Sequence, residues 1–153
     1  MIIIAFGSRS LSERQDAMVI VDRAFRIFYA ESGLFTTLVK YGDARGADIL
    51  MAQWAKDMKI EVQPFPAKWN DWAGLPKDKK KLKRRVDGSQ YNALAGFNRN
   101  QEMIDSGFDA ALCIRMPGHS PGTDDMIERV KLTKKPLMVF HVDGEHEWIK
   151  LAN

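Results

Sequence analysis

Apolar and polar positions along the chain follow two periods, one typical of strands and one typical of helices. Five short apolar runs predict strands, and they cover residues 2–6, 34–41, 60–65, 109–114 and 137–141. Four stretches with apolar residues at helical spacing predict helices, and they cover residues 12–32, 47–58, 98–106 and 124–132. Because strands and helices alternate, the chain is expected to form a parallel sheet with helices packed on both faces.

The expected fold class is α/β, a Rossmann-like three-layer fold with a mostly parallel sheet of about five strands. Ser12 and Gln15 have the spacing of a capping box, and Gly33 is expected to end the helix that follows. Pro64 lacks a backbone donor, which favours the sheet edge for its strand. Trp148 and Ile149 are expected to dock the tail.

The length of 153 residues fits one domain over residues 1–153, with a basic insertion or lid at about residues 66–96. No clear strand pattern is found in that insertion, and its residues 77–86 are expected to form a helix or to stay mobile. No apolar run reaches the roughly 20 residues of a membrane span, and the first apolar run lacks the basic flank of a signal peptide. The single cysteine, Cys113, is expected in the core, which favours a cytoplasmic protein.

The net charge of +3 conceals one basic segment. Residues 77–85 hold seven basic residues and one acidic residue, and the remaining chain holds 16 basic and 19 acidic residues. The basic segment therefore predicts a local patch instead of a uniformly basic surface. Three interpretations stay open for Lys77–Arg85: a solvated surface, a lid over an anionic ligand, or a weak nucleic-acid contact.

Glycine and polar residues follow three of the predicted strands and open one helix. Carboxyl ends of parallel strands meet at one rim, where ligands bind, and helix N-termini there favour anions. The candidate ligand-binding residues are Gly7, Ser8, Arg9, Gly42, Ala44, Arg45, Gly46, Asp48, Arg99, Asn100, Gly118, Gly122 and Thr123. We expect a nucleotide or nucleotide-derived phosphate ligand at this rim.

Each polar candidate also has a structural alternative. Arg45 can pair with Asp43 or Asp48 instead of a ligand, and Arg99 can pair with Glu102 or Asp105. Asp48 can interact with the dipole of its helix, and Thr123 can act as an ordinary N-cap. Neither metal-ligand spacing nor a nucleophile–histidine arrangement is found, so no metal or cofactor is expected.

Taken in order, the motifs make the chain resemble the SLOG superfamily, and within it the YspA-like, cpYpsA-related family. The matching motifs are Gly7-Ser8-Arg9, the G-x-A-R-G-A-D turn over residues 42–48, Ala67-Lys68-Trp69, the A-G-x-x-R-N segment over residues 95–100, and Gly122-Thr123-Asp124-Asp125-Met126. The resemblance spans roughly residues 2–140. It implies a Rossmann-like fold, a nucleotide-derived ligand and self-association, but it does not imply a particular reaction.

Two related groups suggest further functions. Lonely-guy phosphoribohydrolases pair an arginine helix, similar to Arg99-Asn100-Gln101-Glu102-Met103, with a glutamate whose position here is Met126. A thioether cannot stabilise an oxocarbenium ion as a carboxylate does, so hydrolysis of an N-glycosidic bond is a less favoured alternative, with Arg99 and Asp125 as catalytic candidates. DNA-processing protein A carries a similar motif series, which makes single-stranded nucleic-acid binding a third hypothesis.

Overall fold

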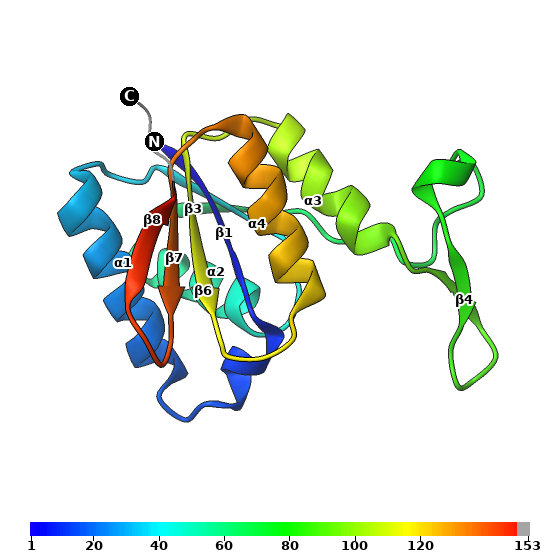
Figure 1. Cartoon of the computed structure of the whole chain (residues 1–153), viewed down its shortest axis with the longest axis horizontal. Helices are drawn as coiled ribbons and strands as arrows, with labels where there is room; N and C mark the ends of the chain where they lie inside the picture. Colours follow the sequence, from blue (N-terminus) through cyan, green and yellow to red (C-terminus); the bar gives the residue numbers. More distant parts are fainter. Residues whose placement is uncertain (150–153) are drawn as a thin grey trace.

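The computed structural model describes residues 1–149, and it contains a central six-stranded sheet (Figure 1). The strands lie in the order β3-β2-β1-β6-β7-β8. Their bounds are β1 Ile2–Gly7, β2 Leu38–Tyr41, β3 Glu61–Pro64, β6 Ala110–Arg115, β7 Leu137–His141 and β8 His146–Ile149. All neighbouring pairs are parallel except β7 with β8. The α/β fold is confirmed, and the β3 edge position expected from Pro64 is also confirmed.

Two helices cover each face of the sheet. Helices α1 (Ala17–Ser32) and α2 (Ala47–Asp57) pack on one face, and α3 (Ala95–Asp105) and α4 (Pro121–Thr133) pack on the other. The side chains of β1 alternate between the two cores: Ile3 and Ala5 lie with α1 and α2, and Ile4 and Phe6 lie with α3 and α4. This double burial explains the unbroken apolar sequence of β1. Cys113 is fully buried, as expected.

The local predictions near α1 and at the carboxyl end have different outcomes. The capping box does not form, because the Ser12 hydroxyl donates to the Arg9 carbonyl within a short 3-10 helix, η1 (Arg9–Glu13), and α1 begins only at Ala17. Gly33 does end α1, in the left-handed conformation. At the carboxyl end, Trp148 and Ile149 do pack against the two cores, as expected, and residues 146–149 also form a sixth strand, which pairs with β7.

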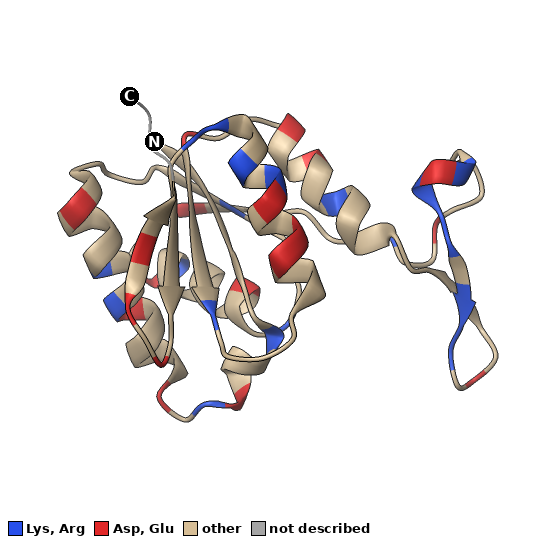
Figure 2. Ribbon diagram, viewed as in Figure 1, with Lys and Arg blue, Asp and Glu red and all other residues tan. Residues whose placement is uncertain are grey.

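The basic insertion is an ordered, projecting hairpin. It contains a 3-10 turn, η2 (Lys77–Lys79), and two short antiparallel strands, β4 (Leu82–Arg84) and β5 (Gln90–Asn92). The prediction that this segment carries no strand is wrong, since a run of cations with one apolar residue, Leu82, hides the strand period. Figures 1 and 2 show this hairpin standing away from the sheet, with Lys and Arg concentrated on β4. We call residues 77–91 the basic arm.

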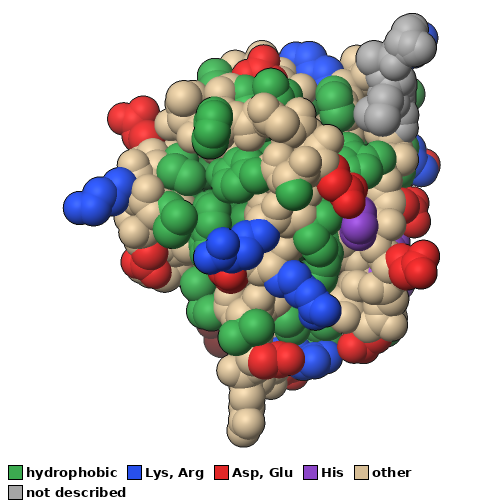
Figure 3. Space-filling model, turned by 90° about the vertical axis from the view of Figure 1, so that its left-hand side faces the viewer, with side chains coloured by type: hydrophobic (Ala, Val, Ile, Leu, Met, Phe, Trp, Pro, Cys, Tyr) green, Lys and Arg blue, Asp and Glu red, His purple; other side chains and the backbone are tan. Residues whose placement is uncertain are grey.

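The surface on the α1 side carries exposed apolar side chains. Figure 3, which views the molecule from this side, shows hydrophobic atoms gathered between scattered charges. Val19 of α1 and Phe35, just after it, are 69% and 86% exposed.

Within residues 1–149, no helix combines the length and the apolar character that crossing a membrane demands.

The strand order places a crevice at the carboxyl ends of β1 and β6. From β1 the chain runs to β2 and β3 on one side, and β6 and β7 lie on the other side. The loops that follow β1 and β6 therefore lead to opposite faces of the sheet, which separates them and leaves space between them. Gly7, the last residue of β1, pairs with Ile114 of β6 at this point.

Candidate functional site

A cavity of about 440 Å³ opens at this crevice. It lies where the loops after β1, β2 and β6 meet the first turn of α3 and the first turn of α4. Ten sequence-predicted residues line it: Gly7, Ser8, Arg9, Ala44, Arg45, Asp48, Arg99, Asn100, Gly122 and Thr123. The tertiary structure thus brings together motifs that are more than a hundred residues apart in the sequence.

Three predicted residues lie outside this cavity. Gly42 lines a neighbouring hollow of about 330 Å³, which shares Arg9, Arg45 and Trp69 with the main cavity. Gly46 lies behind the wall, and Gly118 directs its carbonyl oxygen to the Arg115 guanidinium. For Gly46 and Gly118 the structure shows roles in the backbone of the turns.

The first wall of the cavity consists of the loops after β1 and β2, packed backbone to backbone. Gly46 has a φ of +87°, and a Cβ placed there would collide with the Arg9 carbonyl. The Ala47 N–H, at the start of α2, donates to the Ser8 carbonyl at 3.1 Å. A Cβ on Gly7 would likewise collide with the Ile114 carbonyl. Because glycine has no Cβ, these two positions allow neighbouring backbone segments to lie in direct contact.

Asp48 is the buried carboxylate of this wall. Its residue is 6% exposed, and Oδ2 accepts a hydrogen bond from the Ala44 N–H at 3.4 Å. Burial raises the pKa of Asp48 to about 6, although the positive charge of Arg99 acts in the opposite direction. The role of Asp48 is therefore not limited to a favourable interaction with the α2 dipole. Its carboxyl group is also a titratable group in the cavity wall.

Arg99, in the second turn of α3, ties the ends of two strands together. Its Nη1 donates to the carbonyl of Gly42, just beyond β2, and to the carbonyl of Phe65, just beyond β3, the latter at 3.2 Å. The alternative pairing with acidic residues of its own helix is not seen within residues 1–149. Burial lowers the pKa of Arg99. One side of the guanidinium is thus committed to backbone oxygens.

Arg9 and Arg45 contrast with Arg99 because both are exposed. Neither side chain makes a hydrogen bond or a salt bridge to any residue of the described chain, so Arg45 is not paired with Asp43 or Asp48 there. Both residues line the main cavity and the neighbouring hollow. Two uncompensated guanidinium groups therefore stand at the mouth of the cavity.

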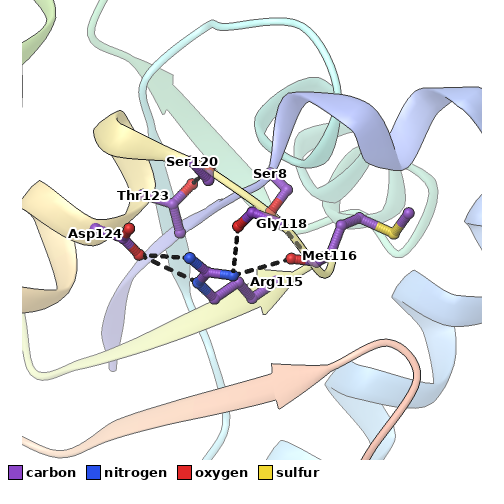
Figure 4. Close-up of polar contacts among 7 residues, drawn as sticks. All are labelled: Ser8, Arg115, Met116, Gly118, Ser120, Thr123 and Asp124. Carbon is purple, nitrogen blue, oxygen red and sulfur yellow. Dashed lines mark hydrogen bonds and ion pairs between the residues drawn. The ribbon is translucent and has the colours of Figure 1, made fainter.

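The second wall is the loop after β6, and a residue that the sequence did not point to holds it. Arg115 donates to the carbonyls of Met116 and Gly118 at 3.0 and 3.2 Å, and its Nη2 lies 2.8 Å from Asp124 Oδ1 (Figure 4). The Ser8 hydroxyl accepts the Met116 N–H at 2.9 Å. An arginine at the end of a strand belongs to no motif, so no signal marked Arg115 in advance.

The N-terminus of α4 faces the cavity with unused donors. Ser120 is the N-cap residue, but its hydroxyl donates to Thr123 Oγ1 at 2.8 Å and caps no backbone N–H. Pro121 has no N–H, and neither Gly122 nor Thr123 uses its backbone N–H in a hydrogen bond to another residue between 1 and 149. The prediction that Thr123 could be the N-cap is wrong, since it is the third residue of the helix.

Sequence reasoning mostly missed the large apolar side chains that also line the cavity. They are Phe6, Trp69, Phe97, Met103, Met116 and Met126, and the polar residues Ser10, His119 and Ser120 line it as well. Trp69 had a signal in the Ala67-Lys68-Trp69 motif, and Met126 stands four residues after Gly122, one helical turn away. The methionine at the motif's glutamate position therefore does face the cavity.

The acidic candidates on α4 are occupied elsewhere. Asp125 Oδ2 accepts a hydrogen bond from Asn100 at 3.0 Å and pairs with Arg129 at 2.7 Å, and Asp125 does not line the cavity. Asp124 holds Arg115. Among the acidic residues of the described chain, Asp48 is the one that lines the cavity.

Comparison with known proteins adds no relative. A scan against protein-family models and searches of curated proteins and of solved structures found no match to this chain. The resemblance to the SLOG superfamily therefore depends on the motifs alone.

No group of three His, Cys, Asp or Glu side chains within residues 1–149 is placed to hold a metal ion.

Proposed function

We propose that the protein binds a nucleotide or nucleotide-derived phosphate ligand in the cavity between β1 and β6, and that it senses or sequesters this ligand. The observation that carries the proposal is the N-terminus of α4, where the N–H groups of Gly122 and Thr123 face the cavity without an acceptor among residues 1–149. Unpaired N–H groups and the positive end of a helix dipole favour a phosphate. Arg9 and Arg45 would add charge-assisted hydrogen bonds at the mouth.

The mixed polar and apolar lining supports a nucleotide over inorganic phosphate. Besides the polar N-terminus of α4, the cavity is lined by aromatic and thioether side chains, among them Trp69, Phe97 and Met126. Such side chains suit the flat, largely apolar face of a base. The volume of about 440 Å³ is in the range of small-molecule sites.

The burial of Asp48 favours a phosphate at α4 over one at α2. Although the turn over residues 42–48 has the denser motif, its helix begins with a buried carboxylate, and the first N–H donates to Ser8. An anion bound there would be repelled by Asp48 whenever that group is ionised. We therefore assign the turn at Gly42–Gly46 a supporting role and the turn at Gly122 the phosphate.

Thermal unfolding with a ligand panel tests the proposal. The panel contains ADP-ribose, nucleoside monophosphates and cyclic nucleotides, and a ligand at about 100 times its dissociation constant stabilises the folded state by about 2.7 kcal/mol. Arg9→Gln and Arg45→Gln should each weaken binding by about tenfold without lowering the melting temperature of the free protein, because both side chains are exposed. Arg23→Gln, an exposed arginine of α1, is the matched control. Absence of any shift at millimolar concentrations would refute the proposal.

A second candidate function is hydrolysis of the N-glycosidic bond of a nucleoside monophosphate. One observation favours it: Asp48 is a cavity carboxyl whose pKa of about 6 lets it donate a proton near neutral pH. In that reaction the C–N bond breaks, and its electron pair leaves with the base, which takes up the proton from Asp48. Water adds to the sugar carbon and gives up a proton, which restores the protonated carboxyl. Base release over time tests this function. Asp48→Asn should abolish release, whereas Asp125→Asn should retain it, because Asp125 does not line the cavity and pairs with Arg129.

Self-association and a cytoplasmic location complete the proposal. The exposed apolar side chains on the α1 side, including Val19 and Phe35, support an interface between copies (Figure 3). Light scattering coupled to size-exclusion chromatography measures the mass, and Phe35→Ser should reduce it to that of the monomer. A monomeric native protein would contradict this part of the proposal.

A further inference from the structure

The basic arm concentrates positive charge that the protein itself does not neutralise. Seven cationic residues lie in it: Lys77, Lys79, Lys80, Lys81, Lys83, Arg84 and Arg85. Each residue from 81 to 90 is exposed, and none of the seven cations makes a salt bridge to any other part of the described chain. Of the two acidic residues, Asp87 accepts the N–H and hydroxyl of Ser89 and so shapes the turn.

The arm is nevertheless built to keep one shape. Asn92, fully buried at its base, accepts the N–H groups of Lys81 and Leu94 at 2.8 and 3.1 Å and donates to the Lys79 carbonyl at 3.0 Å. Arg85 donates to Asn70 at 2.9 Å, which fixes the arm to the preceding loop. A two-stranded hairpin alone is only marginally stable, and mutual repulsion between clustered cations weakens it further. An anionic partner would remove that repulsion.

One face of the arm combines cations with aromatic rings. Lys83 pairs with Tyr91 across the two strands, so their side chains share a face. On the same face the Arg85 guanidinium lies 4.9 Å from the centre of the Tyr91 ring. The Tyr91 ring centre is in turn 6.3 Å from that of Trp69, which lines the cavity. Cationic and aromatic groups thus form a continuous track from the arm to the cavity mouth.

We infer that this track binds a single-stranded polynucleotide. Lys81, Lys83 and the neighbouring cations would contact successive phosphates, and Tyr91 and the edge of Trp69 would contact bases. A duplex, whose bases are already stacked on each other, can use the cations but not the rings. A second copy of the chain fits less well, because the chain outside residues 77–85 has only 19 acidic against 16 basic residues.

Fluorescence anisotropy with labelled oligothymidylate and oligouridylate of about 20 nucleotides, at about 50 and about 200 mM salt, tests the inference. Binding should weaken steeply with salt, by roughly 0.7 logarithmic units of affinity per logarithmic unit of salt for each phosphate contacted. The triple variant Lys79→Gln, Lys81→Gln, Lys83→Gln should reduce that slope by about 2 and weaken binding at least tenfold at the lower salt. The control triple Arg23→Gln, Lys56→Gln, Lys131→Gln removes equal charge from α1, α2 and α4 and should bind as the native protein does.

The variant Tyr91→Leu tests whether the track recognises a single strand specifically and not anions in general. It keeps an apolar side chain but removes the ring, so single-strand affinity should fall by about 5- to 150-fold, with duplex affinity unchanged. Three binding results would each overturn the inference: equal losses in the two triple variants, no binding of either oligonucleotide, or a preference for duplex. It would also be overturned if light scattering showed that the arm triple, and not the control triple, reduces the mass to that of a monomer. The arm triple should leave any mononucleotide-induced thermal shift intact, so this inference can fail or succeed independently of the proposed function.

Discussion

The two walls of the cavity are built from similar parts and use them differently. Each has a glycine-containing turn between a strand and a helix that points its N-terminus toward the crevice. In the first wall the Ala47 N–H donates to Ser8, and the carboxylate of Asp48 occupies the first turn of α2. In the second wall the N–H groups of Gly122 and Thr123 have no acceptor within residues 1–149.

This difference shows that the turn with the most motif residues need not be the turn that binds the ligand. The first wall has the richer motif because two loops pack backbone to backbone there, which demands glycine at Gly7 and Gly46. The second wall has no such demand at Gly122, where a Cβ would meet nothing within 4 Å. We infer that the first wall is a rigid support and that the second wall is the anion site.

The largest expected effect comes from closing the space at Gly46. Gly46→Ala places a Cβ against the Arg9 carbonyl at a φ of +87° and should reduce the free energy of unfolding by about 3 kcal/mol or more. In a chain of this length that lowers the melting temperature by roughly 6–12 °C. Gly122→Ala is the matched control in the second wall and should change stability by less than about 1 kcal/mol. Similar losses in both variants would remove the distinction between the walls.

A smaller effect follows from the titration of Asp48. Burial raises its pKa from 3.8 to about 6, so the folded protein holds this proton more tightly than the unfolded chain does. The resulting stabilisation is complete below about pH 4 and is lost as the pH rises through about 6, a fall of up to about 3 kcal/mol. Urea unfolding between pH 4 and 7 should show this fall in the native protein and a flatter profile in Asp48→Asn. Asp43→Asn, in the same turn but exposed, should retain the fall; parallel native and Asp48→Asn profiles would contradict the prediction.

The smallest effect on stability is expected in the second wall. Asp124→Asn weakens the hold of Arg115 on the loop over residues 116–119, yet the Asp124 side chain is 51% exposed, so stability should change by less than about 1 kcal/mol. Amide hydrogen exchange in that loop should nevertheless become severalfold faster. Glu128→Gln, which removes the partner of Lys131 on the same helix, should leave the loop unchanged. Unaltered exchange in Asp124→Asn would show that Arg115 does not hold the wall.

The sequence alone determined the order of the four helices and of the five parallel strands, and the sites of the turns between them. Both follow from local rules: apolar side chains recur with the period of a strand or a helix, and glycine stands where a turn needs it. The β-α alternation then implied a common rim, and ten predicted residues do line one cavity there. Prediction failed where the strand period is not visible in the local sequence. In β4 the alternation is hidden among cations, and β8 exists only because it pairs with β7.

Tertiary structure decided which parts of that rim are free to act. No local pattern shows that Ser8 occupies the Ala47 N–H, that Arg99 is committed to the carbonyls beyond β2 and β3, or that Arg115 holds the opposite loop. A hydrogen-bonding group becomes available only when no other part of the chain satisfies it, and the partners of the Ala47 N–H and of Arg99 lie 34 to 57 residues away in the sequence. The burial of Asp48 arises in the same way, because loops distant in sequence exclude water from its carboxylate.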